Sequence, residues 1–543
     1  MLPVFFALQK TRLWLPWLTA ASYFFYGWWN PYYLLLVAYS TLLDYTLVAF
    51  MDHCPRAGPT ADKGGRFSLR GLNDKLLNTA FFGAVLAAIA ILAGAVWNPA
   101  IPLPNFVENE AGELNFAGIV WVAGNLRPML LGAEALTLLM ALGALFGSRK
   151  IWLLVSLVNN LALLLFFKYA GFGVANLNAL LAHTHLPLTL ADPSTLMPFG
   201  SKYLLPVGIS FFTFQSLSYT IDFYFGNVQR ERSLLRFATF VCFFPQLMAG
   251  PIERARHLLP QFHKFPAVRL QNFTDGASLF LVGLFKKLAL ANYISLYVER
   301  VYEHPETGSA SALLLGTVAF GWQIYFDFSG YTDMARGVAR LMGFNLILNF
   351  NNPYLATSLG EFWTRWHIGL SSWFRDYVYI PLGGNRLGSW TTCRNLLITF
   401  LISGVWHGSK WTFLIWGALH GIGVIVMREL ERSSFYRERV PRLVKQAGVF
   451  AFVSFTWIFF RADSLPDAML IIRRIATAGW GVSNIPVLMV ALIAAIWGYA
   501  FLYESRFRDF LKTGFVRVGL AVAMVLYLCL CASGGGAFIY FQF

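Results

Sequence analysis

Residues 395–427 read NLLITFLISGVWHGSKWTFLIWGALHGIGVIVM, an apolar stretch that is interrupted in its middle by HGSK at 407–410. The run from Asn395 to Trp406 has 12 residues, which form roughly 18 Å of helix and cannot cross about 30 Å of hydrocarbon. Arginines flank the stretch on both sides, and short loops rich in Lys and Arg stay in the cytoplasm. The sequence therefore predicts a re-entrant segment that enters a membrane, breaks at His407 and returns to the same side.

The rest of the chain has the composition of a membrane protein. Of its 543 residues, 57% are hydrophobic and 13% are charged, and the mean hydropathy is +0.56, whereas soluble domains carry about 25% charged residues. Further apolar runs, long enough or nearly so to cross as helices, lie at about 13–30, 31–50, 78–97, 128–147, 151–168, 203–225, 277–298, 311–328, 446–461, 485–503 and 518–535. We therefore predict an all-α polytopic membrane protein, one membrane domain over 1–543 with about eleven transmembrane helices and re-entrant helices at 237–250 and 395–427.

The net charge of +15 does not indicate nucleic-acid binding, because the basic residues lie in short loops between apolar runs. Such loops are cytoplasmic, whereas the loop at 98–127 is acidic and is expected on the outer side. Loop charge and the odd number of crossings agree on a cytoplasmic N-terminus and a C-terminus outside. The first apolar run begins near Leu13 and is expected to be a membrane helix, not a cleaved signal peptide.

His407 is the first candidate for chemistry. An irregular backbone at membrane depth is tolerated only inside protein or beside water, and an ionisable residue there is a functional candidate. Its imidazole can take up and release protons near neutral pH. The alternative is that His407 only satisfies a buried hydrogen bond at the helix break.

The segment at 360–394, GEFWTRWHIGLSSWFRDYVYIPLGGNRLGSWTTCR, is the second candidate region. It is aromatic, basic and amphipathic, which is typical of a helix at a membrane interface. Backbone amides are freed at Pro381 and the glycines after it. Together with Arg365, Arg375 and Arg386 they can hold the phosphates of a nucleotide-like donor. The alternative is binding of anionic lipid by a surface helix, and His367 is ambiguous for the same reason.

Asp327 ends an apolar helix in the stretch QIYFDFSGYTD at 323–333. It can line a cavity or orient a histidine, or it can pair with Arg336 as a structural ion pair. The predicted substrate-binding residues are Asp327, Arg365, Trp366, Arg375, Asn385 and Trp406.

Other classes of site find no support in the sequence. It contains no Gly-x-Ser-x-Gly, Walker A or His-Glu-x-x-His motif and no carboxylate pair typical of glycosidases. The usual sequence motifs of hydrolases and nucleotide-hydrolysing transporters are therefore absent. The five cysteines form neither metal-ligand spacing nor a disulfide framework. We expect no metal site and no permanently bound cofactor.

These segments resemble the membrane-bound O-acyltransferase superfamily, closest to the bacterial branch that acetylates alginate, cellulose and peptidoglycan. The matching words are YFFYGW at 23–28, PVGISF at 206–211 with FQ at 214–215, FPQL at 244–247 with AGPI at 249–252, YFDFSGY at 325–331, the block at 363–386 and WHG at 406–408. The resemblance implies a ring of tilted helices around a central tunnel, which an acyl-CoA or another acyl thioester enters from the cytoplasm and the acceptor from the other face. It also implies that His407 is the catalytic histidine and His367 a second polar residue of the tunnel, in a catalytic region at 355–427.

Residues 538–543 read FIYFQF and are similar to the terminal Phe-x-Tyr-x-x-Phe motif of a small protein that works beside the D-alanylating member of the superfamily. The resemblance implies that Tyr540 carries the acyl group as an ester, in an extracytoplasmic tyrosine motif at 534–543. The glycines at 534–536 allow the tail to bend toward the tunnel. The alternative is an aromatic anchor at the outer membrane interface.

The sequence thus predicts a bacterial inner-membrane O-acetyltransferase. Acetyl-CoA is expected as the donor, and peptidoglycan, alginate or cellulose as the acceptor, reached indirectly through a periplasmic SGNH/esterase-like acetyltransferase. Membrane lipids are the other expected partners. The alternatives left open are D-alanyl transfer from a carrier-protein thioester, a transporter without acyl chemistry, and a structural membrane subunit that docks a periplasmic enzyme.

Overall fold

The computed structural model describes residues 1–29, 32–54, 78–87, 127–146, 148–184, 189–196, 205–481 and 486–531. Within these ranges the regular structure is helical and no strand occurs, which confirms the predicted all-α fold. The chain divides into two compact units, one of residues 1–248 and 253–267 and the other of residues 249–252 and 268–543.

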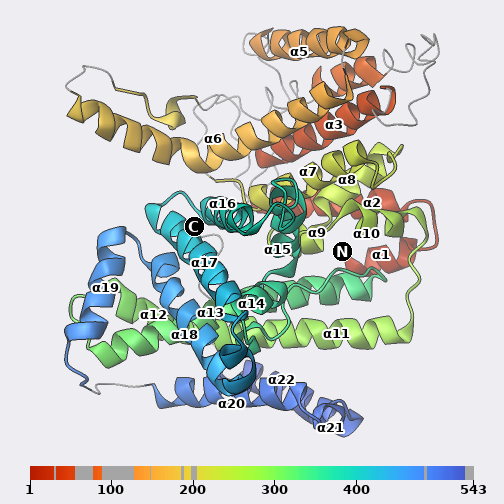
Figure 1. Ribbon diagram of the computed structural model, residues 1–543. Coiled ribbons are helices and arrows are strands. Elements are labelled where there is room, and N and C mark those ends of the chain that lie inside the picture. Colours follow the sequence, from red (N-terminus) through yellow and green to blue (C-terminus); the bar gives the residue numbers. More distant parts are fainter. Residues whose placement is uncertain are drawn as a thin grey trace, which may run out of the picture. The chain divides into compact units, whose positions relative to one another are not determined.

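The first unit is built around three helices that pack on one another, α3 (Tyr32–Asp52), α6 (Arg149–His183) and α7 (Ile209–Phe225) (Figure 1). Its other elements are α1 (Leu2–Leu8), α2 (Trp14–Trp29), a helix at Asn78–Ala87, α5 (Arg127–Phe146), η2 (Pro193–Leu196), α8 (Leu234–Cys242), α9 (Phe244–Leu247), α10 (Ala255–Leu258) and η4 (Leu259–His263). The predicted dip at 237–250 contains α8 and α9, and α8 with nine residues is too short to cross a membrane.

A buried carboxylate on α3 ties these three helices together. Asp44 accepts hydrogen bonds from Ser156 Oγ at 2.6 Å and from Asn160 Nδ2 at 3.0 and 3.1 Å, both on α6. It also accepts one from Ser216 Oγ on α7. Because an unpaired carboxylate is costly in an apolar medium, the three donors fix how otherwise apolar helices align.

In the second unit, a long antiparallel pair of helices forms one wall. α11 (Leu270–Phe285) continues through the π-helical turn η5 (Lys286–Ala291) into α12 (Asn292–Glu303) and packs along α13 (Ala310–Leu341) (Figure 1). A Cβ atom added to Gly283 would lie 2.5 Å from the carbonyl oxygen of Gly330. Such close backbone contact requires small residues at the interface, as in other membrane helix pairs.

Short elements follow α13 and lead to the remaining helices of this unit. They are η6 (Pro353–Leu355), α14 (Leu359–Arg365), α15 (Ile368–Phe374), the π-helical turn η7 (Arg375–Tyr379), α16 (Ser389–His407), α17 (Trp411–Leu430), η8 (Phe435–Arg439), α18 (Arg442–Arg461), α19 (Leu465–Thr477), α20 (Val487–Glu504), α21 (Arg508–Leu511) and α22 (Gly514–Cys531).

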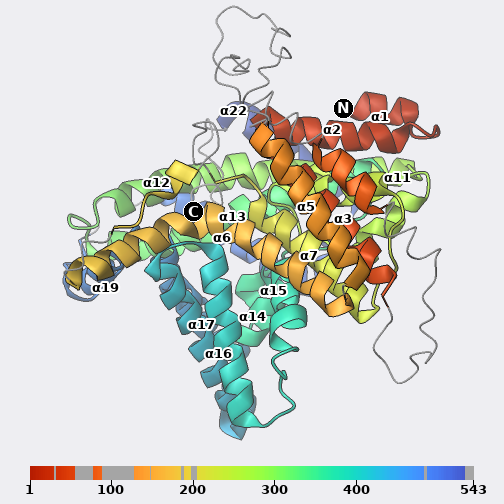
Figure 2. The ribbon, with the colours of Figure 1, turned by 90° about the horizontal axis from the view of Figure 1, so that it is seen from above.

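The stretch at 395–427 forms two longer helices than the sequence predicted. α16 has 19 residues and α17 has 20, which corresponds to about 28–30 Å each. The two helices pack side by side (Figure 2), and a Cβ atom on Gly404 would collide with the carbonyl oxygen of Phe413. The predicted break at 407–410 is confirmed. The predicted 12-residue half-crossing is wrong, because the polar residues from Ser389 onward are also helical.

Six helices in the described ranges are long and apolar enough to cross a membrane. They are Tyr33–Asp52, Arg149–His183, Leu270–Glu303, Trp411–Leu430, Arg442–Arg461 and Val487–Glu504. Helices α2, α5, α7, α13 and α22 occupy further predicted runs. The chain is therefore a multi-pass membrane protein. The predicted outer loop at 98–127, except Arg127, and the tail with Tyr540 lie outside the described residues.

Candidate active site

His367 lies at the junction of two short helices, as the residue that caps the N-terminus of α15. Its φ of 42° falls in the left-handed region, and Asn352 is the other non-glycine residue in the described ranges with this geometry. That conformation costs a residue with a Cβ atom about 1–2 kcal/mol and persists only where the surroundings hold it. The strained backbone makes this junction a candidate functional site, because helix formation alone does not require the left-handed conformation.

Asn349 holds the histidine in place. Its side-chain oxygen Oδ1 lies 3.1 Å from both Gly369 N and His367 Nδ1, and its carbonyl oxygen accepts from Ile368 N at 2.9 Å. Because the Gly369 amide must donate, Oδ1 is the acceptor, and His367 Nδ1 therefore carries the hydrogen. In the neutral ring the other nitrogen, Nε2, can then accept a hydrogen bond but cannot donate one.

The His367 ring is fully buried among aromatic side chains. Its centroid lies 4.7 Å from that of Phe328 and 6.2 Å from that of Trp406. Burial lowers the pKa of His367 to about 3, because removal from water disfavours the charged imidazolium. The ring is therefore neutral at physiological pH.

His407 is the last residue of α16 and is 5% exposed. Its ring centroid lies 4.9 Å from those of Trp406 and Trp416 and 5.2 Å from that of Phe460. Gly408 must follow it without a side chain, because a Cβ atom there would collide with the ring of Phe413. The indole of Trp406 thus contacts both histidines that the sequence predicted, and joins them in one buried cluster.

A third buried histidine, His420 on α17, was missed by the sequence reasoning. It is 0% exposed, and its ring lies 4.7 Å from Trp416, on which His407 also packs. His420 Nε2 lies 2.9 Å from Thr456 Oγ1, whose hydroxyl donates to the carbonyl oxygen of Val453. His420 Nε2 is therefore the donor to Thr456. A lone ionisable residue within an apolar run was the signal that could have identified it.

Two of the predicted substrate-binding residues are buried near this cluster, where one packs in the aromatic core and the other forms an ion pair. Trp366 is 1% exposed and stacks on Phe362, with ring centroids 5.6 Å apart. Asp327 is 3% exposed and pairs with Lys287 Nζ at 2.5 Å. The alternative pairing of Asp327 with Arg336 is wrong, because Arg336 pairs with Asp333.

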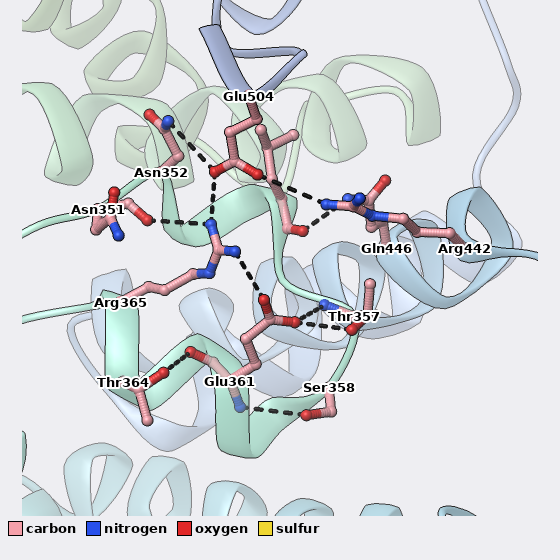
Figure 3. A network of polar contacts seen from close by, with 11 residues as sticks. Asn351, Asn352, Thr357, Ser358, Glu361, Thr364, Arg365, Arg442, Gln446 and Glu504 are labelled. Atoms are coloured by element: carbon pink, nitrogen blue, oxygen red, sulfur yellow. Dashed lines mark hydrogen bonds and ion pairs between the residues drawn. The ribbon is translucent and has the colours of Figure 1, made fainter. Parts of the chain in front are cut away.

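Arg365 belongs to an ion-pair network and not to an open phosphate site (Figure 3). Its guanidinium donates to Glu361 Oε1 at 2.7 Å on its own helix and to Glu504 Oε1 at 2.6 Å at the end of α20. Burial opposes ionisation of Glu361, but hydrogen bonds from Thr357 and the charge of Arg365 outweigh it and lower the Glu361 pKa. Since the pKa of Glu361 is lower in the folded state, its pairing with Arg365 is intact at neutral pH and weakens only as the pH falls below about 4.5.

The remaining predicted substrate-binding residues lie at the surface. Arg375 and Asn385 are exposed, as is Arg386, and Arg375 Nε bonds to Asp376 at 2.9 Å. The predicted residues therefore do not form one site. Trp366, Trp406 and Asp327 are buried, Arg365 serves the ion-pair network, and the others face outward.

A pocket of about 420 Å³ adjoins the buried cluster. Its aromatic wall includes Tyr325, Phe350 and Tyr354, all in ring contact with Trp366. Lys286 and Arg508 also line it. Its lining is divided between apolar and polar side chains, and it includes Asp333, which pairs with Lys286 at 2.7 Å. Phe350 also lies beside His367, at 6.4 Å between ring centroids.

A family model, the membrane-bound O-acyltransferase family, matches residues 191–462, which contain both predicted histidines. The chain is also 32% identical over 453 residues to the peptidoglycan O-acetyltransferase of Helicobacter pylori, covering 73% of this chain and 83% of that relative. The chain belongs to the membrane-bound O-acyltransferase family. The resemblance that the sequence words indicated is confirmed.

Two further relatives of this O-acyltransferase differ in the named activity. The chain is 43% identical over 316 residues to the probable alginate O-acetylase AlgI of Pseudomonas putida. The match covers 58% of this chain and 62% of that relative, so the chain spans less than two thirds of the relative's length. The chain is 29% identical over 232 residues to the teichoic acid D-alanyltransferase of Bacillus subtilis, covering 40% of this chain and 57% of that relative.

We predict that Glu504→Gln slows acyl transfer by about tenfold. Arg365 lies two residues before His367, so loss of the Glu504 charge loosens the connection between α20 and the strained junction, and small misplacements of catalytic groups are costly. Global stability should change little, because partly exposed ion pairs contribute at most about 1 kcal/mol. The rate of acyl transfer is the measurement.

Glu429→Gln is the matched control, since Glu429 pairs at 2.6 Å with Arg432 in a more exposed setting. Equal rates for Glu504→Gln and the control would show that the network does not position the junction.

Proposed function

We propose that this protein transfers an acetyl group from cytoplasmic acetyl-CoA across a bacterial inner membrane, for O-acetylation of an extracytoplasmic polysaccharide. The observation that carries the proposal is the buried pair of His367 and His407, which contact a common indole inside the segment that matches the family. Relatives named for alginate and peptidoglycan O-acetylation support a polysaccharide as the final acceptor.

The pocket beside the cluster suits a thioester donor. Its aromatic wall leads to Phe350, which contacts His367. Arg508 can face the phosphates of CoA, beside Lys286 in its 2.7 Å ion pair with Asp333. This assigns the donor phosphates to the pocket and not to Arg375 or Arg386, which lie at the surface. We propose that the pocket opens to the cytoplasm, because the basic residues between α20 and α22 favour that side.

In the proposed reaction His407 acts as general base. Its imidazole takes the proton from an acceptor hydroxyl as the hydroxyl oxygen bonds to the acetyl carbonyl carbon. The carbon–sulfur bond then breaks, and the departing CoA thiolate takes the proton from the imidazolium. The products are an acetyl ester and the CoA thiol, and His407 is again neutral.

We assign His367 a positioning role toward the attacking hydroxyl. Its Nδ1 hydrogen is directed to Asn349, so Nε2 can accept from a hydroxyl group but cannot donate to the developing oxyanion. The strained backbone and the buried aromatic surroundings hold the ring in one orientation. Such fixed orientation is what a positioned catalytic group requires.

We further propose Tyr540 as the first acceptor. A phenol has a pKa of about 10, which makes its ester more reactive than the ester of a sugar hydroxyl. A periplasmic esterase-like partner can therefore move the acetyl group from the tyrosine to the polymer. The proposal rests on the terminal motif alone, because residues 532–543 lie outside the described ranges.

The test uses purified full-length protein and acetyl-CoA labelled in the acetyl group. We expect label on the peptide that contains Tyr540, found by mass spectrometry, and its loss in Tyr540→Phe and in His407→Ala. CoA release without label on Tyr540 would retain the acyltransferase and reject the tyrosine carrier. Neither label nor release would reject acetyl-CoA as the donor, and the same assay with a D-alanyl carrier-protein thioester would then test the alternative donor.

A further inference from the structure

A second pocket, of about 590 Å³, lies among α11, α13, α20, α21 and α22 of the second unit. Neither His367 nor His407 lines it. Its wall is divided between charged and apolar side chains, and the charged ones are Asp275, Arg336, Arg340 and Arg517. The pocket therefore has features of its own that the acyl-transfer chemistry does not explain.

The charged part of this pocket has more cations than carboxylates. Three arginines line it against one aspartate, a local charge of +2. The pairing of Arg340 with Asp275 is long, at 3.8 Å, and Arg340 Nη1 also donates to Asn345 Oδ1, in the same lining. Arg517 is exposed and has no acidic partner among the described residues. The pocket can therefore accommodate an anion.

Arg336 also has unused hydrogen-bonding capacity. Its Nη1 reaches Asp333 at 3.4 Å, but that carboxylate is held more closely by Lys286 at 2.7 Å. Its Nε is buried and has no hydrogen-bond partner in the described part of the chain. Because a buried donor without an acceptor is costly, an anion with several oxygens would satisfy it. Guanidinium groups match phosphate in this way.

The apolar part of the pocket lies beside the charged part in a definite order along α22. Arg517 is in the first turn of that helix, directly after the basic segment 506–512, and Leu520 and Met524 follow on the same face. Leu279 and Val282 of α11 line the same region. A helix that passes from basic to apolar residues in this way crosses from the head-group level into hydrocarbon. The pocket thus offers cations at one end and an apolar surface at the other.

We propose that this pocket is a binding site for an anionic phospholipid. The phosphate lies among Arg336, Arg340 and Arg517, and the first part of an acyl chain lies along Leu520 and Met524. The other source of a phosphate is the nucleotide end of CoA, because Val282 and Tyr499 line both this pocket and the proposed donor pocket. The proposal does not depend on acyl transfer, since it concerns binding alone.

The test is a titration of the purified full chain in detergent with phosphatidylglycerol, with phosphatidylcholine as the neutral reference, followed by native mass spectrometry. We expect saturable binding of phosphatidylglycerol at least tenfold tighter than of phosphatidylcholine. Arg517→Gln should weaken phosphatidylglycerol binding about tenfold, as expected for loss of a charge-assisted hydrogen bond. Arg517→Lys should fall between the two, because it keeps the charge and loses the fork of donors.

Arg473→Gln is the matched control, since Arg473 is also exposed, lies on α19 and does not line the pocket. Equal binding of the two lipids by the unaltered protein would overturn the proposal, as would unchanged binding in Arg517→Gln. Displacement of phosphatidylglycerol by stoichiometric CoA would overturn it in another way, by assigning the arginines to the donor. The lipid comparison and the CoA competition need no variant, so they remain decisive if Arg517→Gln folds poorly.

Discussion

His407→Gln is expected to reduce acetyl transfer by about 10³-fold, the scale on which a positioned general base contributes to a rate. Glutamine fills a similar volume between Trp416 and Phe460 and can form hydrogen bonds. It cannot take up a proton near neutral pH, so only the chemical step should suffer. The measurement is CoA release and ester formation at saturating acetyl-CoA, together with the thermal unfolding midpoint in the same detergent.

His420→Gln is the matched control for that prediction. His420 is buried and packs on the same Trp416, and its Nε2 is engaged by Thr456. We expect its rate to stay within a few-fold of the unaltered protein. If the two variants lose activity equally, the loss comes from the aromatic core and His407 is not the base.

Asn349→Leu is expected to lower the rate by about 100-fold, as catalytic groups displaced by about 1 Å typically do. Leucine keeps the branched shape of asparagine with bulkier methyl groups, and it removes the acceptor for His367 Nδ1 and Gly369 N. Two buried donors then lack partners, and the left-handed backbone at His367 loses its support. Steady-state rates with the unfolding midpoint measure the effect. Unchanged activity would show that the orientation of His367 does not matter to the reaction.

Asn349→Asp distinguishes orientation from charge at the same position. Aspartate keeps an acceptor for Nδ1 and adds a negative charge, which raises the pKa of His367 from its low value of about 3. Because the reaction is expected to use the neutral ring, the decrease in rate toward acid pH should begin at a higher pH than in the unaltered protein. At alkaline pH the rate should recover. The rate profile from pH 5 to 9 is the measurement. A profile identical to that of the unaltered protein would exclude His367 from the reaction.

Local sequence was sufficient to predict the helical architecture and to select His367 and His407 as candidate residues. The span of an apolar run and the interruption at 407–410 depend on neighbouring residues alone, so 442–461 and 487–504 were predicted within a few residues. The start of α16 at Ser389 was not predicted, because a polar first turn does not differ locally from a loop. His420 was overlooked although its signal was local, a lone imidazole in an apolar run.

The arrangement of the site depended on contacts between distant segments. Asn349 comes 18 residues before His367, and nothing around it indicates that it fixes a tautomer. Nothing in the sequence around Arg365 indicates a long-range partner, but in the fold it forms an ion pair with Glu504, 139 residues away. The sequence alone determined which segments enter the membrane and which residue types are available, since hydrophobic length and helix geometry are local properties. Only the tertiary structure decided which cations are already paired and which imidazole nitrogen carries the hydrogen, because those depend on partners that folding brings within 3 Å or so.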